Sequence, residues 1–464
     1  MNIAELLKKK ERYELFCNSV RGSGHVRKGI PCEDYGIKKE DGEYKIFAVA
    51  DGHGDPNCVR SGVGSRFACE IAAAVLDKFA RQLRESGKEA LIFDATGSGR
   101  ILSQLKGSIV SRWLSAVDSE YKENPLTSEE IRTASKLADE FRRNIRTERM
   151  YGTTLIAGLL TDSYLLLLQQ GDGRCVLFSE NGEASQPIPW DDRCLGTATT
   201  SMCDVDAAQS IRSVVINLAE NPVIACVAGT DGVEDSFPNS MDKTVSYYRR
   251  MLTEACGNGV EAMESALTED LSALSKAGSA DDITVAGFID VKRTRKFIHD
   301  FDKLNRIIDA QDELSVVNDR IQSVENGGLY AFLSQKYSDA MSVYSDAKEK
   351  FDAADGKYKA AARQIAAHES EEMKPEAHDD DETVRLKNII NDMRLDEAHL
   401  APLRRELKKL EAERDSAAQT LAEAETPKKA AEKEFLPRRE AYDKLIEEKE
   451  KLTRQLEKLT KTDR

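Results

Sequence analysis

The chain has 464 residues, more than one ordinary domain holds, so we expect two or three folded units. Its formal net charge of -15 argues against nucleic acid as the main partner, because neutralising a phosphate backbone requires a basic surface. The nine cysteines contain no Cys-x-x-Cys pair, which argues against a disulfide framework or a zinc site. We expect a cytoplasmic protein without a membrane span, because no secretory pattern or apolar stretch of about 20 residues occurs.

The first 290 residues alternate between patterns typical of helices and of short strands. The apolar run 44–50 predicts a buried strand that ends at Asp51. Apolar residues at helical spacing predict helices over 59–83, 101–121, 128–146, 243–256 and 260–276. Further strands are expected over 153–160, 164–170, 174–179, 213–218, 223–228 and 283–290. Hairpin-like spacing of the strands favours an α+β fold over a parallel βαβ fold.

Beyond residue 292 glycine nearly vanishes and apolar residues recur every three or four positions, which predicts long helices. Gly327-Gly328 separates a helix over about 293–324 from an apolar seam over 330–365, and a second seam covers 400–421. Pro427 and Pro437 are expected to bracket a weaker stretch before a final helix over 442–459. The sequence therefore predicts four segments: 1–292, a helical coiled-coil segment 293–368, an acidic linker 369–382, and a second helical coiled-coil segment 383–464.

Two interpretations of this helical tail remain open. The seams either pair with each other as an antiparallel hairpin, or they bind a second copy of the chain or another coiled-coil partner.

Acidic residues occur at the ends of three predicted strands. Asp51 precedes Gly52, Asp231 precedes Gly232, and Asp281 begins a further acidic pair. One Asp-Gly pair is usually only a turn. Several at strand ends favour a site for Mg²⁺ or Mn²⁺, because these ions prefer carboxylate oxygens and lower the pKa of bound water.

Six short motifs follow one another along the chain: 32–34 (CED), 49–54 (VADGHG), 152–154 (GTT), 171–172 (GD), 229–233 (GTDGV) and 280–284 (ADDIT). Their order resembles the metal-dependent protein phosphatases of type 2C, over about 16–290. The resemblance implies a four-layer α/β/β/α sandwich, here followed by an all-α coiled-coil region. It also implies hydrolysis of phosphoserine and phosphothreonine in protein substrates.

The resemblance further implies two Mn²⁺ or Mg²⁺ ions, and a looser third. Asp51 would bridge the two ions, Asp231 and Asp281 would bind the first, and Glu33 with the Gly52 carbonyl would contribute to the second. Asp172 and Asp231 would hold the third ion. The neighbouring Asp34 and Asp282 would orient waters or ligands.

His53 resembles the family's general acid, which protonates the leaving oxygen, although it could instead only bond a metal ligand. Arg27 is the candidate that binds the substrate phosphate. It lies six residues before Glu33 rather than the commoner four, and a bacterial subgroup has a similar stretch, so His25 or Lys28 could share the role. Residues 187–209 are expected to form a flap beside the site.

One alternative is a scaffold whose phosphatase-like domain binds metal while the coiled coil carries the function. Residues suited to every metal position are present, which argues against it.

Overall fold

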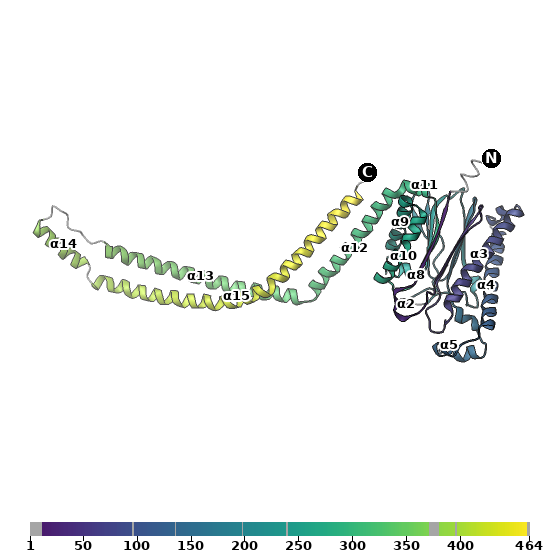
Figure 1. Ribbon diagram of the computed structural model, residues 1–464. Coiled ribbons are helices and arrows are strands. Elements are labelled where there is room, and N and C mark those ends of the chain that lie inside the picture. Colours follow the sequence, from purple (N-terminus) through teal and green to yellow (C-terminus); the bar gives the residue numbers. More distant parts are fainter. Residues whose placement is uncertain are drawn as a thin grey trace. The chain divides into compact units, whose positions relative to one another are not determined.

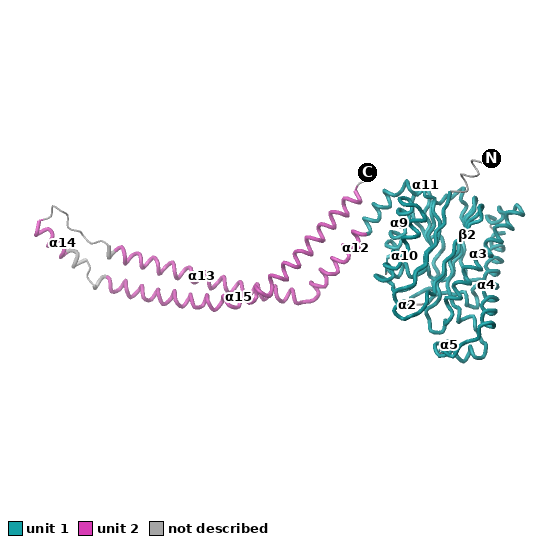
Figure 2. The backbone as a smooth tube through the Cα atoms, viewed as in Figure 1, with its two compact units in different colours: residues 1–308 teal, residues 309–464 magenta. Residues whose placement is uncertain are grey.

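The chain divides into two compact units, residues 1–308 and residues 309–464 (Figure 2). The computed structural model describes residues 12–461 except 95–96, 135, 197, 238–239, 371–379 and 395–396. Within these described ranges, no helix combines the length and the apolar character that crossing a membrane requires.

Two five-stranded antiparallel sheets lie face to face in unit 1 (Figure 1). The strand order is β1-β10-β9-β6-β7 in one sheet and β2-β3-β4-β5-β8 in the other. Apolar side chains fill the space between the sheets, among them Phe47, Ile156 and Phe288. The strands are β1 (Glu14–Val20), β2 (Tyr35–Glu40), β3 (Lys45–Ala50), β4 (Leu155–Leu160), β5 (Tyr164–Gln170), β6 (Arg174–Ser179), β7 (Ala184–Ser185), β8 (Arg212–Asn217), β9 (Val223–Gly229) and β10 (Ile283–Ile289).

Long helices cover the outer face of each sheet, which gives the four layers that the resemblance implied (Figure 1). Helices α3 (Ser61–Glu85) and α4 (Gly97–Glu123) pack on the sheet that contains β3, and the buried Trp113 donates a hydrogen bond to the Gly64 carbonyl. Helices α9 (Met241–Asn258) and α10 (Val260–Ala277) pack on the other sheet. The predicted α+β fold is therefore confirmed.

Short helical segments connect the layers. They are α2 (Ser23–Lys28), η1 (Glu89–Ile92), α5 (Ser128–Thr133), α6 (Ala138–Arg142), η2 (Thr147–Tyr151), α7 (Ala207–Ser210), α8 (Asp231–Glu234), α11 (Val291–Thr294) and η3 (Arg295–Phe297).

Most predicted elements are confirmed, but the single helix expected over 128–146 is wrong. The chain forms the short helices α5 and α6 there, and Thr127 with Glu130 makes a capping box at the start of α5. Asn144 and Arg146 adopt φ values of 57° and 53°, which no right-handed helix accommodates. The prediction also missed β1 and β2, whose mixed polar and apolar residues lack a clear alternation.

Unit 2 consists of long helices. They are the later part of α12 (Ile298–Asn326), which begins in unit 1, then α13 (Leu329–Ser370), α14 (Asp381–Arg394) and α15 (Glu397–Thr460). Gly328, with φ of 69°, separates α12 from α13 as predicted. The acidic linker expected over 369–382 falls largely on residues 371–379, outside the described residues.

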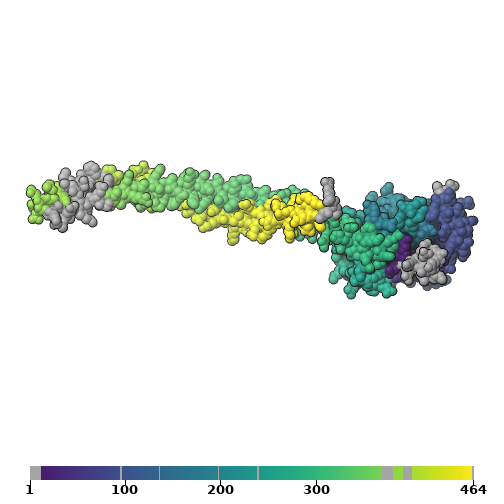
Figure 3. All heavy atoms as spheres, turned by 90° about the horizontal axis from the view of Figure 1, so that it is seen from above, coloured from purple at the N-terminus to yellow at the C-terminus, as the bar shows by residue number. Residues whose placement is uncertain are grey.

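Helices α13 and α15 run antiparallel, side by side, as the space-filling view also shows (Figure 3). Tyr330 meets Tyr442 with ring centroids 4.9 Å apart, and Tyr337 stacks on Phe435 at 5.3 Å. Further along, the Arg414 guanidinium lies 4.2 Å from the ring centroid of Tyr358. Residue numbers rise along α13 as they fall along α15, so the contacts favour the self-contained hairpin.

The weaker stretch expected between Pro427 and Pro437 is wrong, because α15 continues through both prolines and through Pro402. Each proline removes one helical hydrogen bond. Ala431 and Phe435, between the later two, are buried, and this packing offsets the loss.

Candidate active site

A pocket of about 820 Å³ lies where strands of both sheets end, and acidic side chains line it. Asp51 follows β3, Asp231 follows β9 as the first residue of α8, and Asp281 precedes β10. Asp172 lies in the turn between β5 and β6. Residues far apart in the sequence therefore meet at one pocket.

Backbone contacts fix Asp51 in place. Its N–H donates to Thr154 Oγ1 at 3.0 Å, and its carbonyl accepts from Thr153 Oγ1 at 2.8 Å and from the Thr154 N–H at 2.9 Å. The motif 152–154 therefore has a structural role, because its threonines hold the backbone of the Asp51 segment in place.

Glycines let the acidic segments approach one another. A Cβ atom on Gly232 would lie 2.1 Å from the Asp282 carbonyl oxygen, and one on Gly52 would lie 2.6 Å from that of Glu33. Only glycine permits this spacing. The glycine of each Asp-Gly pair is therefore required for packing, whether or not the neighbouring aspartate binds a ligand.

Asp282 lies behind the pocket, 2% exposed, and connects three segments. Its Oδ2 accepts from the Glu33 N–H at 2.6 Å and lies 2.9 Å from His25 Nδ1, while its Oδ1 accepts from the Gly22 N–H. Glu33 Oε1 in turn accepts from Ser61 Oγ at 2.8 Å. Glu33 is therefore held rigidly beside Gly52, although it does not line the pocket itself.

The negative charges are crowded. Burial raises the pKa of Asp51 well above its usual value, and the charges of Asp231, Asp34 and Asp281 raise it further. Burial also raises the pKa of Asp231, and repulsion from Asp172 and Asp281 adds to the effect. The pKa of Asp34 is raised to about 7, first by burial. Asp172 Oδ1 is buried and has no hydrogen-bond partner.

Crowded carboxylates with an unpartnered oxygen fit divalent cations, which supply the missing positive charge and prefer oxygen ligands. As they stand, no three His, Cys, Asp or Glu side chains in the described parts of the chain converge closely enough to hold an ion. The carboxylates line the pocket wall and leave space between them.

The other predicted residues lie at the same pocket. The His53 side chain lines it, and burial lowers the pKa of this imidazole. Arg27 lines the pocket and is exposed, with its Nη1 3.5 Å from Ser23 Oγ. Lys28 and Arg149 also line it. No sequence pattern distinguishes Arg149, which was not predicted.

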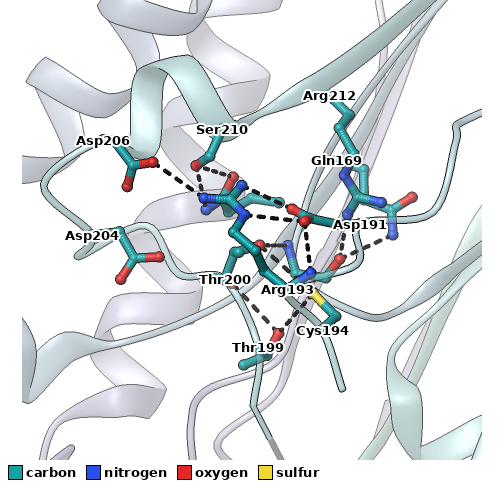
Figure 4. A network of polar contacts seen from close by, with 12 residues as sticks. Gln169, Asp191, Arg193, Cys194, Thr199, Thr200, Asp204, Asp206, Ser210 and Arg212 are labelled. Atoms are coloured by element: carbon teal, nitrogen blue, oxygen red, sulfur yellow. Dashed lines mark hydrogen bonds and ion pairs between the residues drawn. The ribbon is translucent and has the colours of Figure 1, made fainter.

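The loop over 187–209 lies beside the pocket, and a polar network holds it (Figure 4). Arg193 pairs with Asp191 at 2.9 Å and with Asp206 at 3.1 Å, which closes the loop on itself. Arg212 Nη1 donates to the Pro189 carbonyl at 2.8 Å.

The same network reaches the Asp172 turn. Arg212 Nη2 donates to the Gly171 carbonyl, and the Gly171 N–H donates to Thr200 Oγ1 at 3.0 Å. Gln169 Nε2 donates to the Gly173 carbonyl at 2.6 Å. The loop and the turn that carries Asp172 therefore form one hydrogen-bonded assembly.

Residues 21–272 match the model of the family described as Protein phosphatase 2C. The chain belongs to the protein phosphatase 2C family. The family is metal-dependent and acts on phosphoproteins, and this member is a protein serine/threonine phosphatase. No curated protein matches the chain.

Solved structures of bacterial phosphatases are similar to this type 2C phosphatase, with low identity. Serine/threonine phosphatase Stp1 from Staphylococcus aureus is 14% identical, with 60% of this chain and 94% of that chain covered and a TM-score of 0.36. The Mycobacterium tuberculosis phosphatase PstP/Ppp is 18% identical, with 60% and 98% covered and a TM-score of 0.34. A PstP catalytic domain solved with two manganese ions has the same identity and TM-score, with 60% and 97% covered.

The type 2C phosphatase brings most of the predicted site residues to one pocket and the rest directly behind it. Those lining the pocket are Arg27, Asp51, Gly52, His53, Asp172, Asp231 and Asp281. Those outside its lining are Glu33, Asp34 and Asp282, which hydrogen bonds connect to the neighbouring segments.

Proposed function

We propose that this phosphatase hydrolyses phosphoserine and phosphothreonine in proteins with a water molecule activated by two Mn²⁺ or Mg²⁺ ions. The observation that carries the proposal is the convergence of Asp51, Asp172, Asp231 and Asp281 at one pocket, with the pKa values of Asp51 and Asp231 raised by burial and mutual repulsion. Such a cluster is costly without cations. Bound divalent ions would offset the unfavourable free energy of burying these like charges together.

Each carboxylate has a proposed role. Asp51 would bridge both ions, Asp231 and Asp281 would bind the first, and Glu33 with the Gly52 carbonyl would contribute to the second. Asp172 with Asp231 would hold a looser third ion, for which its unpartnered Oδ1 is suited. The neighbours Asp34 and Asp282 would orient these ligands. Bound ions of this kind lower the pKa of a water molecule and neutralise phosphoryl oxygens.

Two further residues are proposed to act on the substrate. Arg27 is exposed at the pocket, so its guanidinium can turn toward a phosphate and donate two hydrogen bonds. His53 would donate a proton to the departing serine or threonine oxygen. Because burial lowers its pKa, the protonated ring is a stronger acid than an exposed histidine, although a smaller fraction carries the proton at pH 7.

We further propose that the helical tail serves docking, oligomerisation or regulation. We also propose that the chain is organised in the four segments 1–292, 293–368, 369–382 and 383–464. The α13–α15 contacts use both apolar seams within one chain, which supports docking or regulation by a self-paired hairpin. A scaffold without catalysis is the alternative.

The test is hydrolysis of phosphoserine, phosphothreonine and phosphotyrosine peptides by the full chain with Mn²⁺, Mg²⁺ or EDTA. We expect activity on the first two peptides with either metal, none in EDTA, and a loss of at least 100-fold in Asp51→Asn. The exposed Asp139→Asn is the matched control, which should retain the rate. Equal rates in EDTA would refute metal dependence, and no hydrolysis with any metal would favour the scaffold.

A further inference from the structure

Arg149, on η2, lines the active-site pocket with a side chain that is 42% exposed. Its Nη1 lies 3.8 Å from Glu140 Oε2 on α6, which is too far for a hydrogen bond. Among the described residues, this guanidinium donates no hydrogen bond to the protein. Its five N–H donors are therefore available to a ligand in the pocket.

Two other arginines at η2 have structural roles instead. Arg60 Nε donates to Glu130 Oε1 at 2.7 Å, and Arg146 Nη2 donates to the Cys203 carbonyl at 2.9 Å. Both side chains connect segments that are distant in the sequence. Arg149 makes no comparable connection, so its place in the pocket is not explained by the fold.

The backbone of η2 is held firmly. Met150 and Tyr151 are fully buried, and the Arg60 N–H donates to the Met150 carbonyl at 2.8 Å. A Cβ atom on Gly64 would lie 1.9 Å from the Tyr151 carbonyl oxygen, so α3 and η2 are in close contact. Only the side chain of Arg149 has to be ordered when it binds a ligand, which keeps the entropic cost of binding low.

This segment packs against His53. Gly152 directly follows η2, and its carbonyl accepts the His53 N–H at 3.0 Å. A Cβ atom on Gly152 would lie 2.6 Å from His53 Cδ2. His53 is proposed above to protonate the departing serine or threonine oxygen, so the substrate polypeptide lies on the His53 side of the reacting phosphate. Residues that flank the phosphorylated one are then within reach of Arg149.

The acidic side chains at this end of the pocket have other partners. Asp55 Oδ1 accepts from the Asn57 N–H at 2.7 Å and from Asn57 Nδ2 at 2.6 Å. Asp204 Oδ2 accepts from the Ser201 N–H at 2.8 Å. The charge of Arg149 is therefore compensated only by the distant Glu140, which favours an anionic ligand.

We propose that Arg149 is a specificity-determining residue, which binds an anionic group next to the phosphorylated serine or threonine of the substrate. A guanidinium binds a carboxylate or a phosphate through two parallel hydrogen bonds. The favoured substrates are therefore acidic or multiply phosphorylated segments. The proposal rests on the phosphatase function and on the role of His53 proposed above.

Glu140 competes with the substrate for Arg149. The Glu140 side chain is 39% exposed and its carboxylate is the group that an acidic substrate residue would replace. Removing it should strengthen the preference for acidic substrates. A purely structural pair would behave differently, because loss of either partner would then have the same effect.

The experiment measures kcat and KM of the full chain with Mn²⁺ on phosphothreonine peptides that carry aspartate, phosphotyrosine or alanine beside the phosphothreonine, and on p-nitrophenyl phosphate. At low salt we expect kcat/KM for the aspartate or phosphotyrosine peptide to exceed that for the alanine peptide by about 3- to 10-fold, mainly through KM. The peptide with the larger ratio identifies the carboxylate or the phosphate as the preferred group.

The variants test the residue itself. In Arg149→Met the ratio should fall to about one, in Arg149→Lys it should be intermediate, and in Glu140→Gln it should rise. Arg142→Met is the control and should retain the wild-type ratio, because Arg142 is exposed outside the pocket lining. If Arg149→Met does not fold, the opposite shifts in Arg149→Lys and Glu140→Gln still decide the question.

Three results would overturn the proposal and leave the phosphatase function standing. They are equal kcat/KM values of the wild-type chain on all three peptides, a ratio that Arg149→Met does not change, and an equal loss in Arg149→Met on p-nitrophenyl phosphate and every peptide. The last result would mean that Arg149 binds the reacting phosphate. No hydrolysis of any substrate by the wild-type chain would overturn both proposals.

Discussion

Replacing Asp34 by asparagine should remove a pH-dependent part of the stability of the metal-free protein. Asp34 is 7% exposed and accepts a hydrogen bond from Thr230 Oγ1 at 2.8 Å. Burial raises its pKa from 3.8 to about 7, and the nearby Asp282 adds to the shift. Because the folded-state pKa is higher, the folded protein binds more protons than the unfolded chain. The resulting stability is full below about pH 4 and is lost as the pH rises through 7.

The size of the effect follows from the two pKa values. For one group with a pKa of about 7 when folded and about 3.9 when unfolded, the free energy of unfolding rises by about 2 kcal/mol between pH 7 and pH 5. The Asp34→Asn side chain does not titrate, so this contribution should vanish. At pH 7 the metal-free variant should also avoid the unfavourable free energy of burying a charged carboxylate at position 34, because asparagine is neutral.

The assay is urea unfolding in EDTA at pH 5, 6 and 7, followed by tryptophan fluorescence. Both tryptophans, Trp113 and Trp190, lie in unit 1, so the signal reports that unit. Asp139→Asn, whose side chain is 82% exposed, is the control and should follow the wild-type pH dependence. If Asp34→Asn also follows it, Asp34 does not titrate in this range and the electrostatic reasoning is refuted.

Three further changes test other parts of the structure. Arg212 donates hydrogen bonds to one carbonyl of the pocket loop and to one of the adjoining turn. Arg212→Met removes both, so it should lower the free energy of unfolding by about 2–4 kcal/mol and raise KM for a phosphopeptide. Arg212→Lys should be intermediate in both assays. Gly64→Ala would place a Cβ atom 1.9 Å from the Tyr151 carbonyl oxygen and should cost about 2 kcal/mol or more in urea unfolding, whereas Gly99→Ala, in open space, should not destabilise. Tyr337→Ala breaks an aromatic stack between α13 and α15 and should reduce the stability of unit 2 by about 1–2 kcal/mol in circular dichroism melts; unchanged melting would mean that the stack contributes nothing.

The strand-end positions of the acidic residues were predictable from the sequence. Asp51 directly follows an apolar run, and Asp281 lies two residues before another, so the period of the pattern places both at strand ends. Their meeting at one pocket was not visible in any local pattern, since it depends on the pairing of the two sheets. The resemblance to a known family supplied that expectation.

Contacts across long separations in the chain account for what the sequence did not indicate. His25 and Asp282 meet because β1 pairs with β10, and β1 itself gave no clear strand pattern. Arg149 reaches the pocket from η2, just after the stretch 128–146 that was predicted as one continuous helix. The prolines of α15 also misled the prediction, because local rules count the lost hydrogen bond but not the packing of neighbours such as Phe435.

The most direct test of the central claim is the number of Mn²⁺ ions bound per chain, measured by equilibrium dialysis of the full chain and of Asp51→Asn. If Asp51 bridges two ions in the acidic pocket, the wild-type chain should retain two tightly bound ions and the variant should lose at least one of them. Retention of no Mn²⁺ by the wild-type chain, or equal retention by both proteins, would contradict the assignment of the carboxylate pocket as the metal centre of this phosphatase.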